Sequence, residues 1–245
     1  MDINNKNIEE IDFQTGHVLL VDKPLTWTSF DVVNKIRYHI KQRLGVKKIK
    51  VGHAGTLDPL ATGLLIICTG AYTKRIDEFQ NQTKEYTGVI SLGGTTASYD
   101  LESEVDTFYP TEHITAELIE KARVSFLGDI EQYPPIFSAI KMDGKPIYLA
   151  ARAGKEVEVK SRPVTIHEFE ITKSDLPEIH FRIVCSKGTY IRSIANDFGV
   201  AVESGGHLSK LRRTKSGEFD VDHAWSVEEL VSSLNGEALN EVNPS

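Results

Sequence analysis

The sequence is poor in cysteine and lacks a long apolar run. Two of its 245 residues are cysteine, and Cys68 and Cys185 each end a strand-like run (LLIIC and FRIVC), outside any CxxC or Cys/His array. A disulfide framework and a zinc finger are therefore excluded, and two buried thiols in a reducing compartment are predicted. The polar, acidic start MDINNKNIEEID does not resemble a secretory signal, and no apolar run approaches the roughly 18 residues of a membrane span. We expect a cytoplasmic protein without membrane contact.

Several signatures of nucleotide, metal and hydrolase sites are also missing. The sequence has no GxGxxG or GxxxxGK[ST] loop, no GxSxG elbow and no HExxH motif. Its histidines and cysteines lack metal-ligand spacing. We therefore expect no cofactor and no metal. A Ser/His/Asp triad depends on tertiary geometry, so the sequence neither excludes nor favours one.

The net charge of −7 is distributed unevenly along the chain. Both ends are acidic, and residues 17–215 carry 27 Lys and Arg against 24 Asp and Glu. Two clusters within this region are basic and free of acids: residues 35–50 contain seven Lys or Arg, and KLRRTK (210–215) contains four. Either cluster alone could be a solvated face. Together, in an acidic chain, they favour a polyanionic ligand with a defined docking face.

Residues 28–45 have the pattern of an amphipathic helix. Thr28 or Ser29 can cap its start and Gly45 can end it. Its apolar positions recur at steps of three and four residues: Phe30, Val33, Ile36, Ile40 and Leu44. The basic side chains fall largely off this stripe, so the helix can bury one side and offer charge on the other.

The remaining patterns indicate a mixed α+β fold with a largely antiparallel sheet and flanking helices, because hairpin signals are frequent and no regular βαβ repeat occurs. Strands are expected at 17–24, 64–70, 84–94, 162–173, 179–188 and 207–219, a DG hairpin leading into a short helix within 137–154, helices at 71–79, 114–128, 189–199 and 226–234, and a loop at 96–110. The expected organisation is a flexible extension at 1–16, one domain at 17–225 and an acidic C-terminal helix and tail at 226–245.

One short loop surrounds a single acid with conformationally special residues. VGHAGTLDPLATGLL (51–65) places Asp58 before Pro59 and between Gly55 and Gly63. An Asp-Pro pair is ordinarily a turn or helix cap. Here the glycines allow the backbone to approach a ligand, and Pro59 restricts Asp58 to an extended backbone that fixes where its carboxylate points. A carboxylate aimed in this way can act as a nucleophile or a base.

This loop and several other segments resemble the motifs of one enzyme family. GHAGTLDPLATGLL is similar to the active-site motif of the TruB-type pseudouridine synthases. Further matches follow in the expected order over about residues 17–225: KPLTWTSFDVV (23–33), KEYTGVISLG (84–93), YPPIFSAIKMDGKPIYLAARAG (133–154), SKGTYIRSIANDFG (186–199) and GGHLSKLRR (205–213). The chain departs from the family pattern at Thr26, where Gly is usual, and at Ala54, where Thr is usual.

The resemblance implies a tRNA pseudouridine synthase that isomerises the T-loop uridine at tRNA position 55. It implies the pseudouridine synthase fold, with a mixed sheet and a central RNA-binding cleft. The expected partner is the T-arm stem-loop of tRNA; no protein partner is implied, and a monomer is expected. Only about 20 residues follow the matching region, too few for a PUA domain, so the catalytic domain is expected to supply the affinity for tRNA.

The resemblance also assigns roles to individual residues. Asp58 would be the nucleophile, and Arg192 would pair with its carboxylate to keep it ionised and oriented. Tyr86 would stack on the extruded uracil and take or relay a proton. Substrate-binding roles fall on His53, Tyr190 and Leu211, with Lys23 and Lys74 in support near the cleft. The target base must be flipped out of its loop, and phosphate contacts from the two basic clusters would offset that cost.

Two other functional classes stay open at this level. A non-catalytic RNA-binding or RNA-refolding protein could keep the fold, but it would have no chemical need for Asp58, Arg192 and Tyr86 together. A small-molecule lyase or hydrolase could use a carboxylate, but it would leave the basic clusters without a role.

Overall fold

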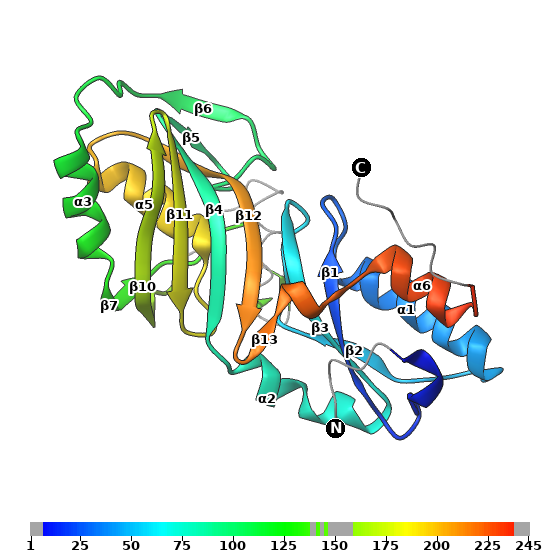
Figure 1. Cartoon of the computed structure of the whole chain (residues 1–245). Coiled ribbons are helices and arrows are strands. Elements are labelled where there is room, and N and C mark those ends of the chain that lie inside the picture. Colours follow the sequence, from blue (N-terminus) through cyan, green and yellow to red (C-terminus); the bar gives the residue numbers. More distant parts are fainter. Residues whose placement is uncertain (1–6, 138–140, 143–144, 147–158, 238–245) are drawn as a thin grey trace. The chain divides into compact units, whose positions relative to one another are not determined.

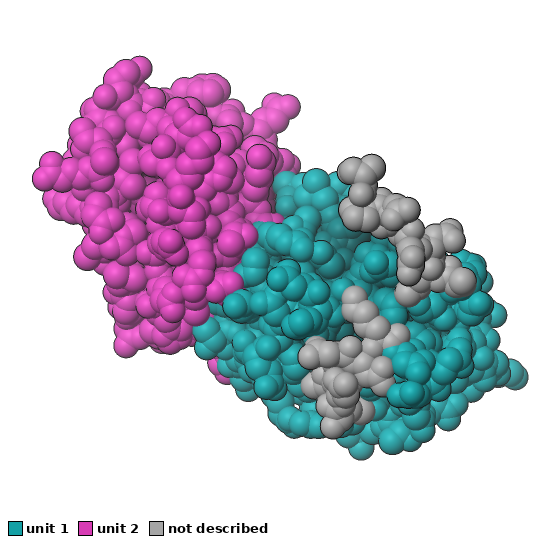
Figure 2. Space-filling model, in the orientation of Figure 1, with its two compact units in different colours: residues 1–84, 212–245 teal, residues 85–211 magenta. Residues whose placement is uncertain are grey.

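The computed structural model describes residues 7–137, 141–142, 145–146 and 159–237 (Figure 1). The chain divides into two compact units, which Figure 2 colours separately: unit 1 comprises residues 1–84 and 212–245, and unit 2 comprises residues 85–211. Each unit is described by itself. The two short strands of the expected hairpin, β8 (Lys141–Met142) and β9 (Lys145–Pro146), pair in antiparallel fashion. The tip of this hairpin and the short helix expected after it lie outside the described residues.

Unit 1 is organised around a sheet in which β1 lies between β14 and β3. β1 pairs with β14 in parallel and with β3 in antiparallel fashion, with Lys23 opposite Gly63. β2 also pairs with β3, and the end of β12 continues the sheet and pairs with β13. The strands are β1 (Val18–Lys23), β2 (Val51–Ala54), β3 (Ala61–Thr69), β12 (Gly206–Ser216), β13 (Phe219–Asp220) and β14 (Trp225–Ser226).

Both faces of this sheet are covered, which explains the uninterrupted apolar run in β3. Leu65 and Ile67 pack in one cluster with helices α1 (Ser29–Leu44) and α6 (Val227–Leu234). Leu64 and Ile66 point to the other face. There they pack in a cluster that contains Phe79 of α2 (Ile76–Gln80), which follows the 3₁₀ helix η2 (Gly70–Arg75). A strand buried on both faces needs apolar residues at every position.

Helix α1 begins and ends where the sequence predicts. Thr28 forms a reciprocal capping box with Asp31, and Gly45 ends the helix with a left-handed backbone (φ 61°). The predicted apolar stripe is wrong in its first turn: Phe30 is 60% exposed, and Val32 is buried in its place.

The segment expected to be a flexible extension is packed from residue 7 onward. It forms a 3₁₀ helix, η1 (Ile8–Glu10), and Ile8, Ile11 and Phe13 are buried in the same cluster as α1. The C-terminal helix is confirmed as α6, and its Leu230 and Leu234 are buried there too. Both described ends of the chain therefore contribute to the core of unit 1.

Unit 2 contains the order β12–β4–β11–β10–β7, with the first part of β12 at one end. Its strands are β4 (Lys84–Leu92), β7 (Gly128–Gln132), β10 (Arg162–Asp175) and β11 (Glu178–Cys185); Lys84 itself is assigned to unit 1. The predicted pairing of β10 with β11 is confirmed, with Asp175 opposite Glu178. Unit 2 also contains helices α3 (Ala116–Ser125) and α5 (Ile191–Ala201). The phenyl rings of Phe126, Phe169, Phe181 and Phe198 lie in a chain of contacts about 6 Å apart between centroids.

The prediction of a loop at 96–110 is partly wrong. Two short strands, β5 (Gly94–Thr96) and β6 (Val105–Phe108), form a separate antiparallel pair. The α+β class with a mixed, largely antiparallel sheet and flanking helices is confirmed. Cys68 and Cys185 are buried and form no disulfide with each other, and burial raises the pKa of the Cys68 thiol to about 12. No helix among the described residues is long and apolar enough to span a membrane.

Candidate active site

The candidate residues are divided between the two units. Unit 1 contains Asp58, His53, Lys23 and Lys74. Unit 2 contains Tyr86, Tyr190, Arg192 and Leu211. The surroundings of each group are described within its own unit.

Asp58 lies in the loop between β2 and β3, and it is half-buried. The loop begins a turn there, because the Asp58 carbonyl accepts a hydrogen bond from the Ala61 N–H at 3.0 Å. The preceding residue is fixed through Ser29, whose Oγ accepts from the Leu57 N–H (2.9 Å) and donates to the Leu57 carbonyl (3.1 Å). Ser29 is the first residue of α1 and is itself buried. The helix start thus holds the backbone immediately before the acid.

The residue after the acid is fixed from another segment. The Pro59 carbonyl accepts a hydrogen bond from the Thr26 N–H at 2.8 Å. Thr26 adopts a left-handed backbone (φ 70°), which is costly for a β-branched residue. The same conformation is free of strain for Gly, the residue usual at this position in the family that the sequence resembles. Thr26 therefore stores backbone strain beside the loop.

Lys23 is fully buried beneath this loop. Its ammonium donates to the carbonyls of Pro24 (2.8 Å), Trp27 (2.7 Å) and Pro59 (3.4 Å). Burial lowers its pKa from 10.5 to about 8, although the nearby charge of Asp58 raises the pKa. Lys23 therefore ties the segment before α1 to the loop of the candidate nucleophile and places a titratable charge close to it.

Arg213, to which the sequence assigned only a phosphate contact, supports the same loop from β12. It is 1% exposed, and its guanidinium donates to the carbonyls of Gly55 (3.1 Å) and Leu64 (2.7 Å). Gly63 (φ 104°) allows the backbone of β12 to pass close to β3, since a Cβ there would lie 2.2 Å from the Arg213 carbonyl oxygen. No sequence pattern distinguishes an arginine whose guanidinium donates to buried carbonyl oxygens.

His53 and Lys74 differ in their surroundings. His53 lies on β2, and burial, followed by the charge of Arg213, lowers its pKa below the ordinary 6.5. It is therefore neutral at pH 7 and can act as a hydrogen-bonding group. Lys74 is exposed on η2.

In unit 2, Arg192 occupies the first turn of α5 and is 3% exposed. Its Nη1 donates to the Ser98 carbonyl at 3.1 Å, and its Nε lies 3.6 Å from Asp100 Oδ2. Asp100 is also buried. A buried arginine with a buried carboxylate partner is a fixed group, not the surface arginine that its place on a helix would suggest.

The other three residues of unit 2 occupy defined positions as well. Tyr190 precedes α5, and Gln132 binds both its N–H (2.8 Å) and its carbonyl (3.0 Å). The Arg162 guanidinium lies 4.4 Å from the centroid of the Tyr190 ring. Tyr86 is 8% exposed on β4, and Leu211 is half-buried on β12. Gln132 is a further support that no sequence motif indicated.

Comparison with known proteins decides the family. A family model described as the N-terminal domain of TruB family pseudouridylate synthases matches residues 41–191, and a C-terminal domain model of tRNA pseudouridylate synthase B matches residues 192–242. The chain belongs to the TruB family. The predicted family resemblance is confirmed over most of the sequence.

Relatives within the TruB family are close in sequence and length. The tRNA pseudouridine synthase B of Phocaeicola vulgatus is 58% identical over 95% of this chain and 99% of its own length. That of Flavobacterium johnsoniae is 59% identical over 91% and 98%. Among solved structures, a chain of the crystal structure of a Cbf5-Nop10-Gar1 complex matches with a TM-score of 0.69 and 28% identity, over 96% of this chain. The present chain spans 60% of the length of that chain.

The second basic cluster of this TruB-family chain, residues 210–215, is largely in contact with other residues of the protein. In the second cluster, Arg213 is buried, Arg212 binds both carboxylate oxygens of Asp22 (3.0 and 2.6 Å), and Lys215 lies 3.5 Å from Asp220. The burial of Arg213 removes one of the four cations from any contact with RNA, whereas Arg212 and Lys215 stay partly exposed beside their carboxylates, so phosphate contacts by the rest of this cluster stay a prediction.

Metal binding has no structural support in the described ranges. There, no three His, Cys, Asp or Glu side chains gather closely enough to hold an ion.

Proposed function

We propose that this protein isomerises uridine to pseudouridine in tRNA, at position 55 of the T loop, with Asp58 as the nucleophile. Membership of the TruB family and relatives of nearly the same length named tRNA pseudouridine synthase B support the reaction and the substrate class. The observation that carries the role of Asp58 is its loop. The residues on both sides of the acid are hydrogen-bonded to other segments, through Ser29 and Thr26.

Such fixation suits a nucleophile because attack requires a short, aligned approach. Asp58 would form a temporary covalent bond to the nucleotide. The bond between the base nitrogen and the sugar breaks, the base turns, and a ring carbon of the base bonds to the sugar instead. That carbon loses its proton, the freed ring nitrogen gains one, and the bond between Asp58 and the nucleotide breaks again, which restores the free carboxylate. All bonds broken and formed lie within one nucleotide and the enzyme, so the net reaction requires no redox partner and no phosphate donor.

Arg192 would pair with the Asp58 carboxylate and orient it. Its burial supports this role, since its contacts with Ser98 and Asp100 restrict the guanidinium before any substrate arrives. A fixed cation loses little conformational entropy when it positions a second carboxylate.

The tyrosines and the other candidate residues would hold the extruded base. Tyr86 would stack on the uracil and take or relay a proton, and Tyr190 and Leu211 would line its pocket. The two hydrogen bonds from Gln132 support a fixed position for Tyr190. Neutral His53 would contact the RNA near the position that the base leaves, with Lys23 and Lys74 in support. The cleft that receives the RNA, a monomeric state and a cytoplasmic location stay predictions; two buried cysteines that form no disulfide with each other suit a reducing compartment.

The test is to incubate the purified protein with unmodified tRNA and to map pseudouridine by mass spectrometry. The proposal predicts one modified uridine, at position 55. An unchanged T loop would favour a non-catalytic RNA-binding protein. Equal activity on free UMP and on a T-arm hairpin would favour a small-molecule enzyme.

A further inference from the structure

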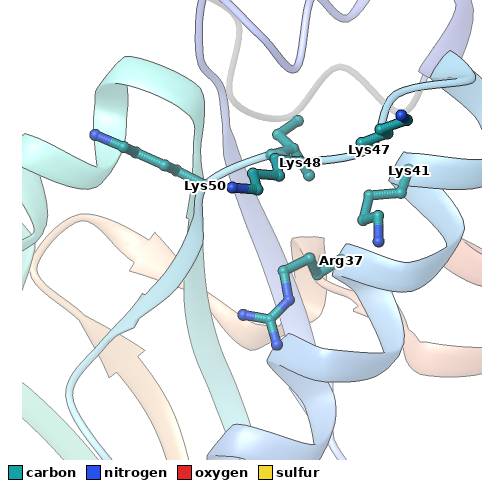
Figure 3. Close-up of a pocket in the computed structure, with 6 residues that line it drawn as sticks. Arg37, Lys41, Lys47, Lys48 and Lys50 are labelled. Atoms are coloured by element: carbon teal, nitrogen blue, oxygen red, sulfur yellow. The ribbon is translucent and has the colours of Figure 1, made fainter.

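The first basic cluster forms a hollow with five cationic side chains. It lies in unit 1, has a volume of about 590 Å³, and is lined by Ile49 together with Arg37, Lys41, Lys47, Lys48 and Lys50 (Figure 3). Arg37 and Lys41 come from helix α1, and the three other lysines come from the segment that leads into β2. These five side chains are called the basic hollow below.

Within the described residues, no carboxylate neutralises the charges of the basic hollow. Among the described residues, none of the five has a carboxylate within ion-pair distance, whereas Arg43 of the same cluster is paired with Glu9 at 2.7 Å. Lys47, Lys48 and Lys50 are exposed. Since the whole chain carries a net charge of −7, solubility gives no reason to gather cations here.

A partly exposed stripe of α1 continues the basic hollow toward the start of the helix. Phe30, Asn34, Arg37 and Lys41 follow one another at steps of four, three and four residues, and so share one face. The Arg37 guanidinium binds the Asn34 side chain and lies 5.9 Å from the centroid of the Phe30 ring. An aromatic ring and an amide beside a row of cations are typical of surfaces that bind the nucleic-acid backbone.

The basic hollow lies at a defined distance along α1 from the Asp58 loop. Ser29, the first residue of the helix, binds Leu57 next to Asp58. At 1.5 Å per residue, Arg37 and Lys41 lie about 12 and 18 Å further along the helix axis. A single nucleotide cannot span this distance, so a ligand that occupies both places must be a longer polyanion.

Resting on the proposed function, we infer that the basic hollow binds the sugar-phosphate backbone of the substrate RNA outside the target loop, in the base-paired stem. It contributes affinity and salt dependence without reading bases and without touching the reacting nucleotide. Substrate affinity then depends on RNA that extends beyond the loop.

The test compares two double variants with the same change of charge. K47Q/K48Q removes two cations of the basic hollow, and the control K121Q/K173Q removes two exposed lysines of unit 2. Each phosphate contact contributes about 0.9 to the slope of log affinity against log salt concentration. With 1 M salt as the reference, the loss of one contact therefore lowers the affinity at 0.1 M salt by up to about eightfold. For K47Q/K48Q we expect the dissociation constant of a complete T-arm to rise roughly 10- to 60-fold and the salt slope to fall by about 2. The kcat at saturating RNA should stay within about twofold, and the affinity for an RNA limited to the loop should change little.

Three outcomes would overturn this inference. K47Q/K48Q could bind the T-arm as the control does; both variants could lose affinity equally, which would show an effect of net charge alone; or the loss could be as large for the loop as for the full arm. Loss of binding to vesicles of anionic phospholipid, with RNA binding intact, would assign the basic hollow to a membrane instead. A wild-type protein that makes no pseudouridine would refute the proposed function, whereas normal product with unaltered binding by K47Q/K48Q refutes this inference alone.

Discussion

Replacement of the buried lysine beneath the nucleophile loop should change how stability depends on pH. In Lys23→Met, an unbranched apolar side chain of similar length replaces the ammonium group and its three hydrogen bonds to carbonyl oxygens. The loss of these hydrogen bonds lowers the free energy of unfolding at pH 7. The loss of the titratable amine changes how the free energy of unfolding depends on pH, and this change identifies the variant.

The sign follows from the direction of the pKa shift. Burial lowers the pKa of Lys23 from 10.5 to about 8 in the folded protein. Below pH 8 the lysine is protonated in both states, so this group gives no slope. Between pH 8 and 10.5 the unfolded chain holds the proton that the folded protein has released, and stability rises with pH. A shift of about 2.5 pH units corresponds to about 3 kcal/mol, at 1.36 kcal/mol per unit.

The assay is urea unfolding of both proteins from pH 7 to 10.5, followed by tryptophan fluorescence. The free energy of unfolding of the wild type minus that of Lys23→Met should increase by about 3 kcal/mol across this range. Other groups titrate in both proteins and cancel in the difference. Lys121→Met, which removes an exposed lysine, should give a flat difference. A flat or falling difference for Lys23→Met would refute the placement of a destabilised cation under the loop.

Two further substitutions test the backbone around Asp58. Thr26→Gly should increase the free energy of unfolding by roughly 0.5–1 kcal/mol, because relief of left-handed strain exceeds the added entropy of glycine; destabilisation in urea would contradict the strain at φ 70°. Gly63→Ala should cost more than about 3 kcal/mol, because its Cβ would lie 2.2 Å from the Arg213 carbonyl oxygen. Gly45→Ala, at φ 61° with open space around it, is the matched control and should lose only about 1 kcal/mol.

Local signals in the sequence predicted much of the fold. Thr28 and Gly45 mark the ends of α1 because caps depend on a few neighbouring residues. The paired strands β10 and β11 are visible as two β-rich runs around Pro177. The sequence does not predict the pair β5–β6 because both strands are short and their two large apolar residues, Val105 and Phe108, point to opposite faces, so no periodic apolar pattern forms.

Some features of the candidate site can be predicted from local sequence, and others depend on contacts between distant segments. Asp58 stands out because glycines and a proline around an acid are a local pattern. The exposure of Phe30 depends on what packs against the first turn of α1, and the burial of Arg213 depends on carbonyls contributed by distant segments. The hydrogen bond from Arg212 to Asp22 likewise joins residues that are far apart in the sequence. Charge counts along a sequence cannot distinguish cations that support a loop from cations that meet a ligand.

The most direct measurement is single-turnover pseudouridine formation by Asp58→Asn on unmodified tRNA. Asp77→Asn, which makes the same change at an exposed carboxylate of α2, is the control. The nucleophile assignment predicts no detectable product from Asp58→Asn, a tRNA dissociation constant within a few-fold of that of the wild type, and normal product from Asp77→Asn. Product from Asp58→Asn at the wild-type rate would contradict it.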